Sequence, residues 1–177
     1  MKRMIQWAGR VLFLLSLGAA AMVAHAQAYF DEEEEKPWEE LPLQLPAFPR
    51  DENFLSFYVS PTATNRFYLD TASLSVGSDG VVRYVLLALS ESGVRNITYE
   101  GMRCQTRERR IYATGRPDGS WAEARAGKWV RIREQVTNRQ HAALFTDLLC
   151  PDGVIVHRVG DILRSLKKEG RPLVPTP

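Results

Sequence analysis

The sequence predicts an α+β fold, an antiparallel β-meander sheet with one or two C-terminal helices packed on it. Short aromatic and β-branched runs, separated by tight-turn signals, occupy the chain from residue 54 to residue 132. Apolar residues at three- and four-residue spacing appear only in the last third. No helical spacer long enough for a parallel βαβ unit separates the runs, so we expect antiparallel pairing.

The strand signals come in order along the chain. The runs expected to form strands are 54–59, 66–70, 81–90, 94–104, 110–115 and 129–132. Asp79-Gly80 is the clearest hairpin signal, because both residues tolerate the positive φ of tight hairpin turns. Charged strand positions are expected on the solvated face of such a sheet.

Two helices are expected after the strands. Residues 138–150 place five apolar side chains on one helical face, with Asn138 as N-cap and Pro151 as terminator. The second helix is expected over residues 161–168, with Asp161 as its cap.

The first 26 residues are typical of a secretory signal peptide. Basic residues precede the apolar run 11–23, and Ala24-His25-Ala26 has the small-x-small form that signal peptidase cleaves. The run of 13 residues is shorter than the ~20 that a transmembrane helix needs. We therefore expect cleavage after Ala26, export of the mature chain and no transmembrane segment in it.

Removal of the signal changes the charge. The chain has 23 Lys+Arg and 21 Asp+Glu, and three of the basic residues lie in the signal. The mature chain is therefore near neutral, and we divide it into a flexible acidic, proline-rich leader (residues 27–52), one domain (53–170) and a disordered tail (171–177). The leader is either a solvated segment or a strap that docks through its apolar residues, which are Trp38, Leu41, Leu43, Leu45 and Phe48.

Cys104 and Cys150 are the two cysteines of the chain. In an oxidising compartment an even pair without metal-ligand neighbours is most simply one disulfide, and no CxxC spacing indicates redox chemistry. Free reactive thiols are the alternative interpretation.

Motifs for catalysis and cofactor binding are missing from the sequence. It contains no zinc-ligand spacing, P-loop, G-x-G-x-x-G or G-x-S-x-G pattern. We therefore expect no cofactor and no metal, and we interpret His141 and His157 as structural histidines. A hydrolase or transferase with an unrecognised site is an alternative that requires one histidine to meet a carboxylate or serine in a pocket.

Charge is distributed unevenly along the mature chain. Residues 95–139 carry 11 basic and five acidic residues, whereas residues 31–52 carry nine acidic and two basic ones. The arginine segment is a solvated sheet face, a docking surface for the acidic leader, or a site for an external anion or acidic partner. The candidate residues are Arg103, Arg107, Arg109, Arg110 and Arg131. Nucleic acid is not expected, because the chain is exported and lacks its recognition motifs.

Several short motifs together resemble the CNP1-like family of exported bacterial proteins. They are YEGMRC, RRIYATGRPDGSW, the Trp129–Ile132 run and the closing DLLCP, within residues 54–156. Thr114 departs from this pattern, which has an aromatic residue there. The resemblance implies a Gram-negative envelope protein in which Cys104 and Cys150 form the family's pair. It implies no activity.

The sequence thus favours a non-enzymatic periplasmic module that binds an envelope component or partner through its arginine-bearing sheet surface. The two alternatives are the hydrolase or transferase named above and a structural or assembly role with the acidic leader as the docking arm.

Overall fold

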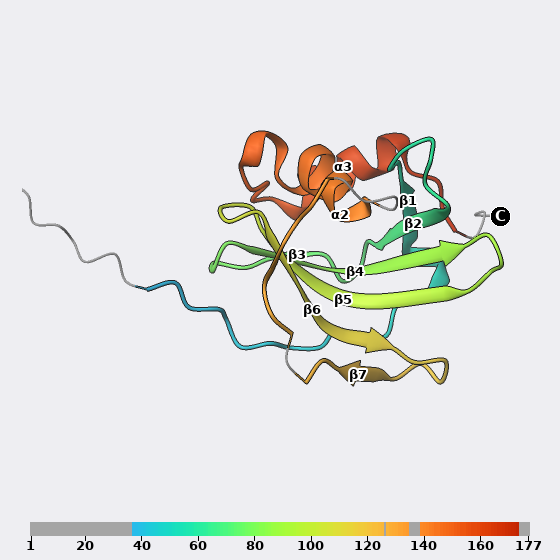
Figure 1. The fold of residues 1–177 in the computed structure, drawn as a ribbon, viewed down its shortest axis with the longest axis horizontal. Coiled ribbons are helices and arrows are strands. Elements are labelled where there is room, and N and C mark those ends of the chain that lie inside the picture. Colours follow the sequence, from blue (N-terminus) through green and yellow to red (C-terminus); the bar gives the residue numbers. More distant parts are fainter. Residues whose placement is uncertain (1–36, 126, 135–138, 174–177) are drawn as a thin grey trace, which may run out of the picture. The chain divides into compact units, whose positions relative to one another are not determined.

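The computed structural model describes residues 37–125, 127–134 and 139–173. It is an antiparallel sheet with C-terminal helices on one face, which confirms the predicted α+β class (Figure 1). The expected signal peptide and residues 27–36 of the leader lie outside the described residues.

The sheet follows the order β1-β2-β4-β5-β6-β7, with β3 paired to β4 and β8 paired to β6. Every pairing is antiparallel, as expected of a meander. The strands are β1 (Phe54–Phe57), β2 (Asn65–Asp70), β3 (Ser75–Val76), β4 (Val81–Ser90), β5 (Arg95–Arg103), β6 (Glu108–Gly115), β7 (Trp121–Glu123) and β8 (Val130–Arg131). No strand is predicted for β7, and β6 begins two residues before its predicted start.

A register shift between β5 and β6 changes which side chains share a face. Tyr99 pairs with Ala113 and Glu100 pairs with Ile111, so Tyr112 is the extra residue of a bulge. Tyr112 and Ala113 consequently belong to the same buried cluster, although neighbouring strand residues normally point to opposite faces.

The helical region differs from its prediction in three respects. The single helix expected over 138–150 is a short α2 (Gln140–Ala143) that continues as a π-helix, η2 (Leu144–Leu149). After the turn η3 (Pro151–Gly153), α3 (Val159–Glu169) begins two residues before the predicted start. Asp161 is therefore in the first turn of α3, not at its cap.

Each face of the sheet carries its own buried cluster. The larger cluster lies under the helices and includes Leu69, Tyr84, Met102, Leu144 and Ile162. The smaller one lies on the opposite face and includes Phe54, Leu87, Ile97, Tyr99 and Tyr112, with Phe48 and Trp121 packed against it.

The predicted disulfide is present on the helix side. Cys104 directly follows β5 and Cys150 directly follows η2, and their Cα atoms are 5.5 Å apart. The bond therefore joins the sheet to the helical layer.

Residues assigned to the C-terminal tail also contact the sheet. Residues 171–173 lie beside β1, where Ser56 N donates to Arg171 O (2.8 Å) and Leu173 N donates to Phe54 O (3.0 Å).

Candidate functional site

The docked leader segment (residues 39–50) crosses the sheet face opposite the helices as an extended chain without helix or strand (Figure 1). It is held there by side-chain contacts at two places. One is centred on Glu40 and the other on Phe48.

Three hydrogen-bond donors and one ion-paired guanidinium converge on the Glu40 carboxylate, and their side chains form what we call the carboxylate receptor. Arg110 Nη1 lies 2.6 Å from Oε2, and the Tyr112 hydroxyl donates to Oε1 at 2.5 Å. The Trp129 indole N–H donates to Oε2 at 3.2 Å, and Arg83 Nη2 lies 3.8 Å from Oε1. Both oxygens are thus satisfied by residues from β4, β6 and the segment before β8.

Arg83 is nearly buried, with 7% of its surface exposed, in the apolar strand β4. A buried guanidinium needs a fixed counter-charge, which Asp79 supplies through bonds of 3.2 and 2.6 Å. Burial acts to raise the pKa of Asp79, but the bonds from Arg83 and from the backbone N–H groups of Leu41 and Val81 outweigh it and lower that pKa. Asp79 therefore fixes the position of the Arg83 guanidinium in the carboxylate receptor.

Tyr112 lies across β5 because Gly101 leaves room for it. A Cβ at Gly101 would stand 2.2 Å from the Tyr112 hydroxyl oxygen. The guanidinium carbons of Arg83 and Arg110 lie 5.9 and 5.4 Å from the Tyr112 ring centre. Burial, and then the hydrogen bond to Glu40 and its charge, raise the pKa of Tyr112, so its hydroxyl remains a donor.

The second anchor is Phe48. Its ring lies 5.1 Å from that of Trp121, whose indole N–H donates to the Pro46 carbonyl at 2.9 Å. A Cβ at Gly115 would stand 3.1 Å from Phe48 and 3.0 Å from Ile97, so this glycine keeps the site open.

The five predicted arginines do not form one site. Arg110 belongs to the carboxylate receptor. Arg103 lies on the same face, 3.7 Å from Glu108 and 5.7 Å from the Trp129 ring centre. Arg131 is exposed on β8, opposite Glu108.

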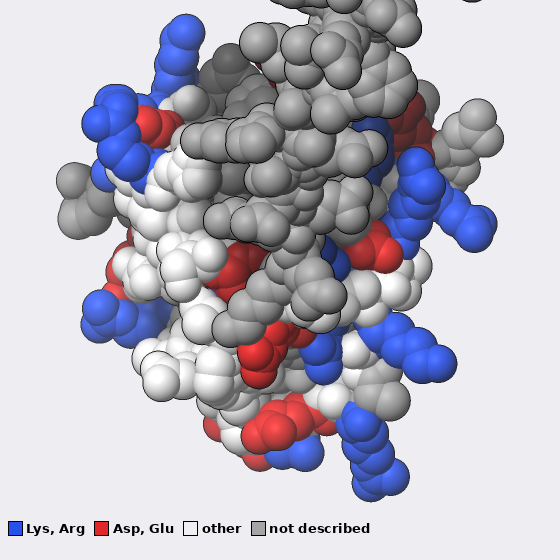
Figure 2. Space-filling view, turned by 90° about the vertical axis from the view of Figure 1, so that its left-hand side faces the viewer, with Lys and Arg blue, Asp and Glu red and all other residues white. Residues whose placement is uncertain are grey.

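The other two arginines lie on the helix side. Arg107 packs over the Phe145 ring and pairs with Glu134, and Arg109 interacts electrostatically with the buried Glu100 and Tyr84. On the part of the surface that the grey residues leave visible in Figure 2, basic side chains lie among acidic ones.

The receptor residues that the sequence analysis did not propose as binding residues are Arg83, Tyr112 and Trp129. Two sequence signals are connected with Arg83 and Tyr112. Arg83 is the one arginine inside the apolar run 81–90, and Gly101 is a glycine inside a strand, which indicates a close approach by another group. Neither signal identifies Glu40 as the partner.

His141 meets a carboxylate, as the hydrolase alternative requires. Its Nε2 lies 2.8 Å from Glu100 Oε2, which also accepts from the Tyr84 hydroxyl at 3.2 Å. Burial acts to raise the pKa of Glu100, but His141, Thr98 and Arg109 together lower it. The Glu100 side chain is only 2% exposed, and neither Glu100 nor His141 lines any of five cavities of 300 to 720 Å³. The pair therefore joins α2 to β5, and His157 is exposed.

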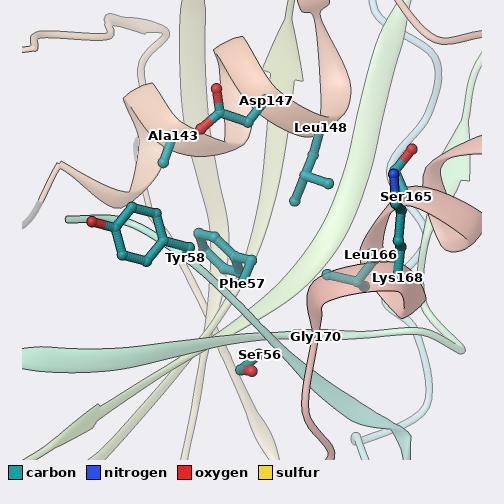
Figure 3. Close-up of a pocket in the computed structure, with 10 residues that line it drawn as sticks. All are labelled: Ser56, Phe57, Tyr58, Ala143, Asp147, Leu148, Ser165, Leu166, Lys168 and Gly170. Carbon is teal, nitrogen blue, oxygen red and sulfur yellow. The ribbon is translucent and has the colours of Figure 1, made fainter. Parts of the chain in front are cut away.

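One cavity of about 440 Å³ lies between β1, η2 and α3. Phe57, Leu148 and Leu166 line it, and Asp147 and Lys168 are its charged residues (Figure 3). None of the described residues that line it is a histidine or a cysteine.

Among the described residues, no group of three or more His, Cys, Asp or Glu side chains is arranged to hold a metal ion. No helix in that part of the chain is both long and apolar enough to span a membrane.

Comparison with protein families gives a match to the CNP1-like family over residues 33–167. The match begins inside the leader and so includes both Glu40 and Phe48. No curated protein and no solved structure matches the chain.

Proposed function

The chain belongs to the CNP1-like family, and from that premise we propose that it is an exported, periplasmic protein that binds an acidic partner of the cell envelope without catalysis. The binding surface is the sheet face that carries the carboxylate receptor. The signal-like residues 1–26 support export, and the disulfide is consistent with an oxidising compartment.

The observation that carries the proposal is the convergence of three hydrogen-bond donors and one ion-paired guanidinium on a single carboxylate. Arginine offers planar paired donors, and the tyrosine and indole groups add fixed single donors, which together suit a carboxylate. Glu40 occupies the receptor and identifies the chemical group that it accepts. Of the five predicted arginines, Arg107 and Arg109 lie on the helix side of the sheet. The proposed binding surface therefore includes Arg110, with Arg103 and Arg131 beside it.

In-cell crosslinking of the full-length protein, followed by mass spectrometry, tests this function. Arg110→Glu should remove captured envelope partners, whereas Arg66→Glu, the same charge change at an exposed position of β2, should keep them. Adding Arg131→Glu asks whether the neighbouring exposed arginine contributes. An unchanged set of partners in folded Arg110→Glu protein would refute the proposal.

An assembly role through the leader is the second candidate. It is favoured by Leu41, Leu43 and Leu45, which stay 42%, 41% and 36% exposed at alternate positions while the segment is docked. Replacing the three leucines by serine should then abolish the crosslinks that Arg110→Glu leaves intact.

A further inference from the structure

We propose that the carboxylate receptor and the Phe48 site together recognise an extended acidic segment of another protein, with the docked leader segment as an exchangeable occupant. This inference rests on the proposed function and specifies its partner. The recognised pattern is a carboxylate followed eight residues later by an aromatic side chain.

The attachment of the leader favours exchange. Among the described residues, its polar contacts with the sheet include the Glu40 carboxylate, the Leu41 N–H on Asp79 and the Pro46 carbonyl on Trp121. Within the described residues, segment 39–49 forms no backbone–backbone hydrogen bond with the sheet. Residues 171–173, in contrast, form two such bonds with β1. A segment held by a few side chains belongs to the parts of a protein that open most readily.

The spacing of the two anchors defines the pattern. The leader joins the two sites by an eight-residue step without helix or strand, which can reach at most about 29 Å, so a ligand that fills both sites in the same way is extended as well. Pro42 and Pro46 restrict the segment between the anchors, which lowers the entropy lost on docking. Residues 41–45 are exposed in the docked state, so their side chains can vary without loss of the anchors.

The leader can leave without disturbing the sheet. It joins β1 through the 3-10 turn η1 (Asp51–Asn53), in which Asn53 N donates to Arg50 O at 3.0 Å. Asp51 also pairs with Arg95, through bonds of 2.9 and 2.5 Å. These contacts keep the η1 turn attached to the domain, C-terminal to both anchors. The leader segment can therefore pivot at this turn when the anchors are released.

A labelled peptide with the sequence of residues 37–50 tests the exchange by fluorescence polarisation. We expect weak binding to the wild-type mature chain, because its own leader competes. The Glu40→Gln/Phe48→Ala chain should bind the peptide at least ~10-fold more tightly. Glu39→Gln is the matched control: Glu39 is exposed and adjacent, and this chain should bind like wild type.

A second measurement leaves both anchors intact. A fluorophore on Glu39→Cys should gain mobility when excess unlabelled peptide displaces the leader of the otherwise unchanged chain. A peptide that lacks both the glutamate and the phenylalanine should cause no change.

The inference is overturned if the folded double variant binds the peptide no better than the Glu39→Gln chain, or if saturating peptide leaves the fluorophore unchanged. If the peptide fails while envelope crosslinks still depend on Arg110, the proposed function survives with another ligand. If the peptide binds but Arg110→Glu loses no envelope partner, the proposed function fails and the two-anchor recognition remains.

Discussion

The two faces of the sheet are covered in different ways. Under the helices, apolar side chains such as Leu144, Leu149 and Ile162 are at most 1% exposed, and the disulfide ties the layer to β5. The opposite face is crossed by a single extended segment anchored at Glu40 and Phe48. One cover is a packed layer with a covalent bond, and the other is an arm held at two points.

This difference separates stability from recognition. Burial of apolar area supplies most of the free energy of folding, so the helix side should control global unfolding. The leader segment itself packs only Phe48 against the smaller buried cluster of its face, among the described residues, and it lies over a specific set of donors. We therefore expect substitutions on the helix side to unfold the protein and substitutions at the anchors to release the leader.

The largest effect is expected from breaking the disulfide. Replacing Cys104 and Cys150 by alanine should lower the free energy of unfolding by about 4 kcal/mol, because the bond closes a loop with a sequence separation of 46. Urea unfolding followed by far-UV circular dichroism measures the loss. A loss below about 1 kcal/mol would show that the helical layer holds without its covalent bond.

Removing the imidazole beside Glu100 should cost about 3 kcal/mol. His141→Ala leaves the buried Glu100 carboxylate without its contact to the His141 Nε2 at 2.8 Å, and removing one member of a buried pair is more damaging than replacing both members. The double variant His141→Ala/Glu100→Gln should therefore regain part of the loss. If the double variant is less stable than the single one, the pair does not act as described.

On the leader side, Gly101→Ala should weaken docking by about 2 kcal/mol, because the added Cβ overlaps the Tyr112 hydroxyl and forces it away from Glu40. Gly160→Ala in α3 is the matched control. Its Cβ would meet only Arg164 Nη1 at 4.0 Å, and alanine favours a helix, so stability should hold or rise. Leader docking is measured by the mobility of a label at residue 39, and equal mobility in the two variants would contradict the expected overlap.

Lowering the pH should reduce the free energy of unfolding through Glu100 on the helix side, by less than the substitutions above. The pKa of Glu100 is lowered in the fold, so its contribution to stability is present above its ordinary value of 4.5 and is lost as pH falls through the lower folded value. Wild type should therefore lose stability below pH 4.5 more steeply than Glu100→Gln. Parallel pH profiles of unfolding free energy for the two proteins would contradict this assignment.

The sequence predicted the meander, the helical region and the disulfide because each depends on local pattern or on cysteine count. It did not predict the π-helix, since residues 138–150 have ordinary helical spacing, nor the separation of Arg109 from Arg110. That separation depends on strand register: neighbouring residues point to opposite faces, and the bulge then places Tyr112 beside Ala113.

The candidate site was predictable only in part. Docking of the acidic leader was one of three interpretations of the charge asymmetry. In the structure, Arg110 is the predicted arginine that binds a leader carboxylate, that of Glu40. Arg83 and Trp129 were not identified because their shared contact with Glu40 joins residues 43 and 89 positions apart along the chain. Such long-range contacts leave no periodic signal, and buried Arg83 is visible only as a charge within an apolar strand.

The central claim is that the leader is a separately releasable cover of one sheet face. The most direct measurement follows the indole N–H signals of Trp121 and Trp129 by ¹⁵N NMR, since both donate to the docked segment. In Glu40→Gln, but not in Glu39→Gln, both signals should move toward solvent-exposed positions while the unfolding free energy stays within about 1 kcal/mol of wild type. The claim is contradicted if Glu40→Gln leaves both signals in place, or if it unfolds the helix side together with the leader.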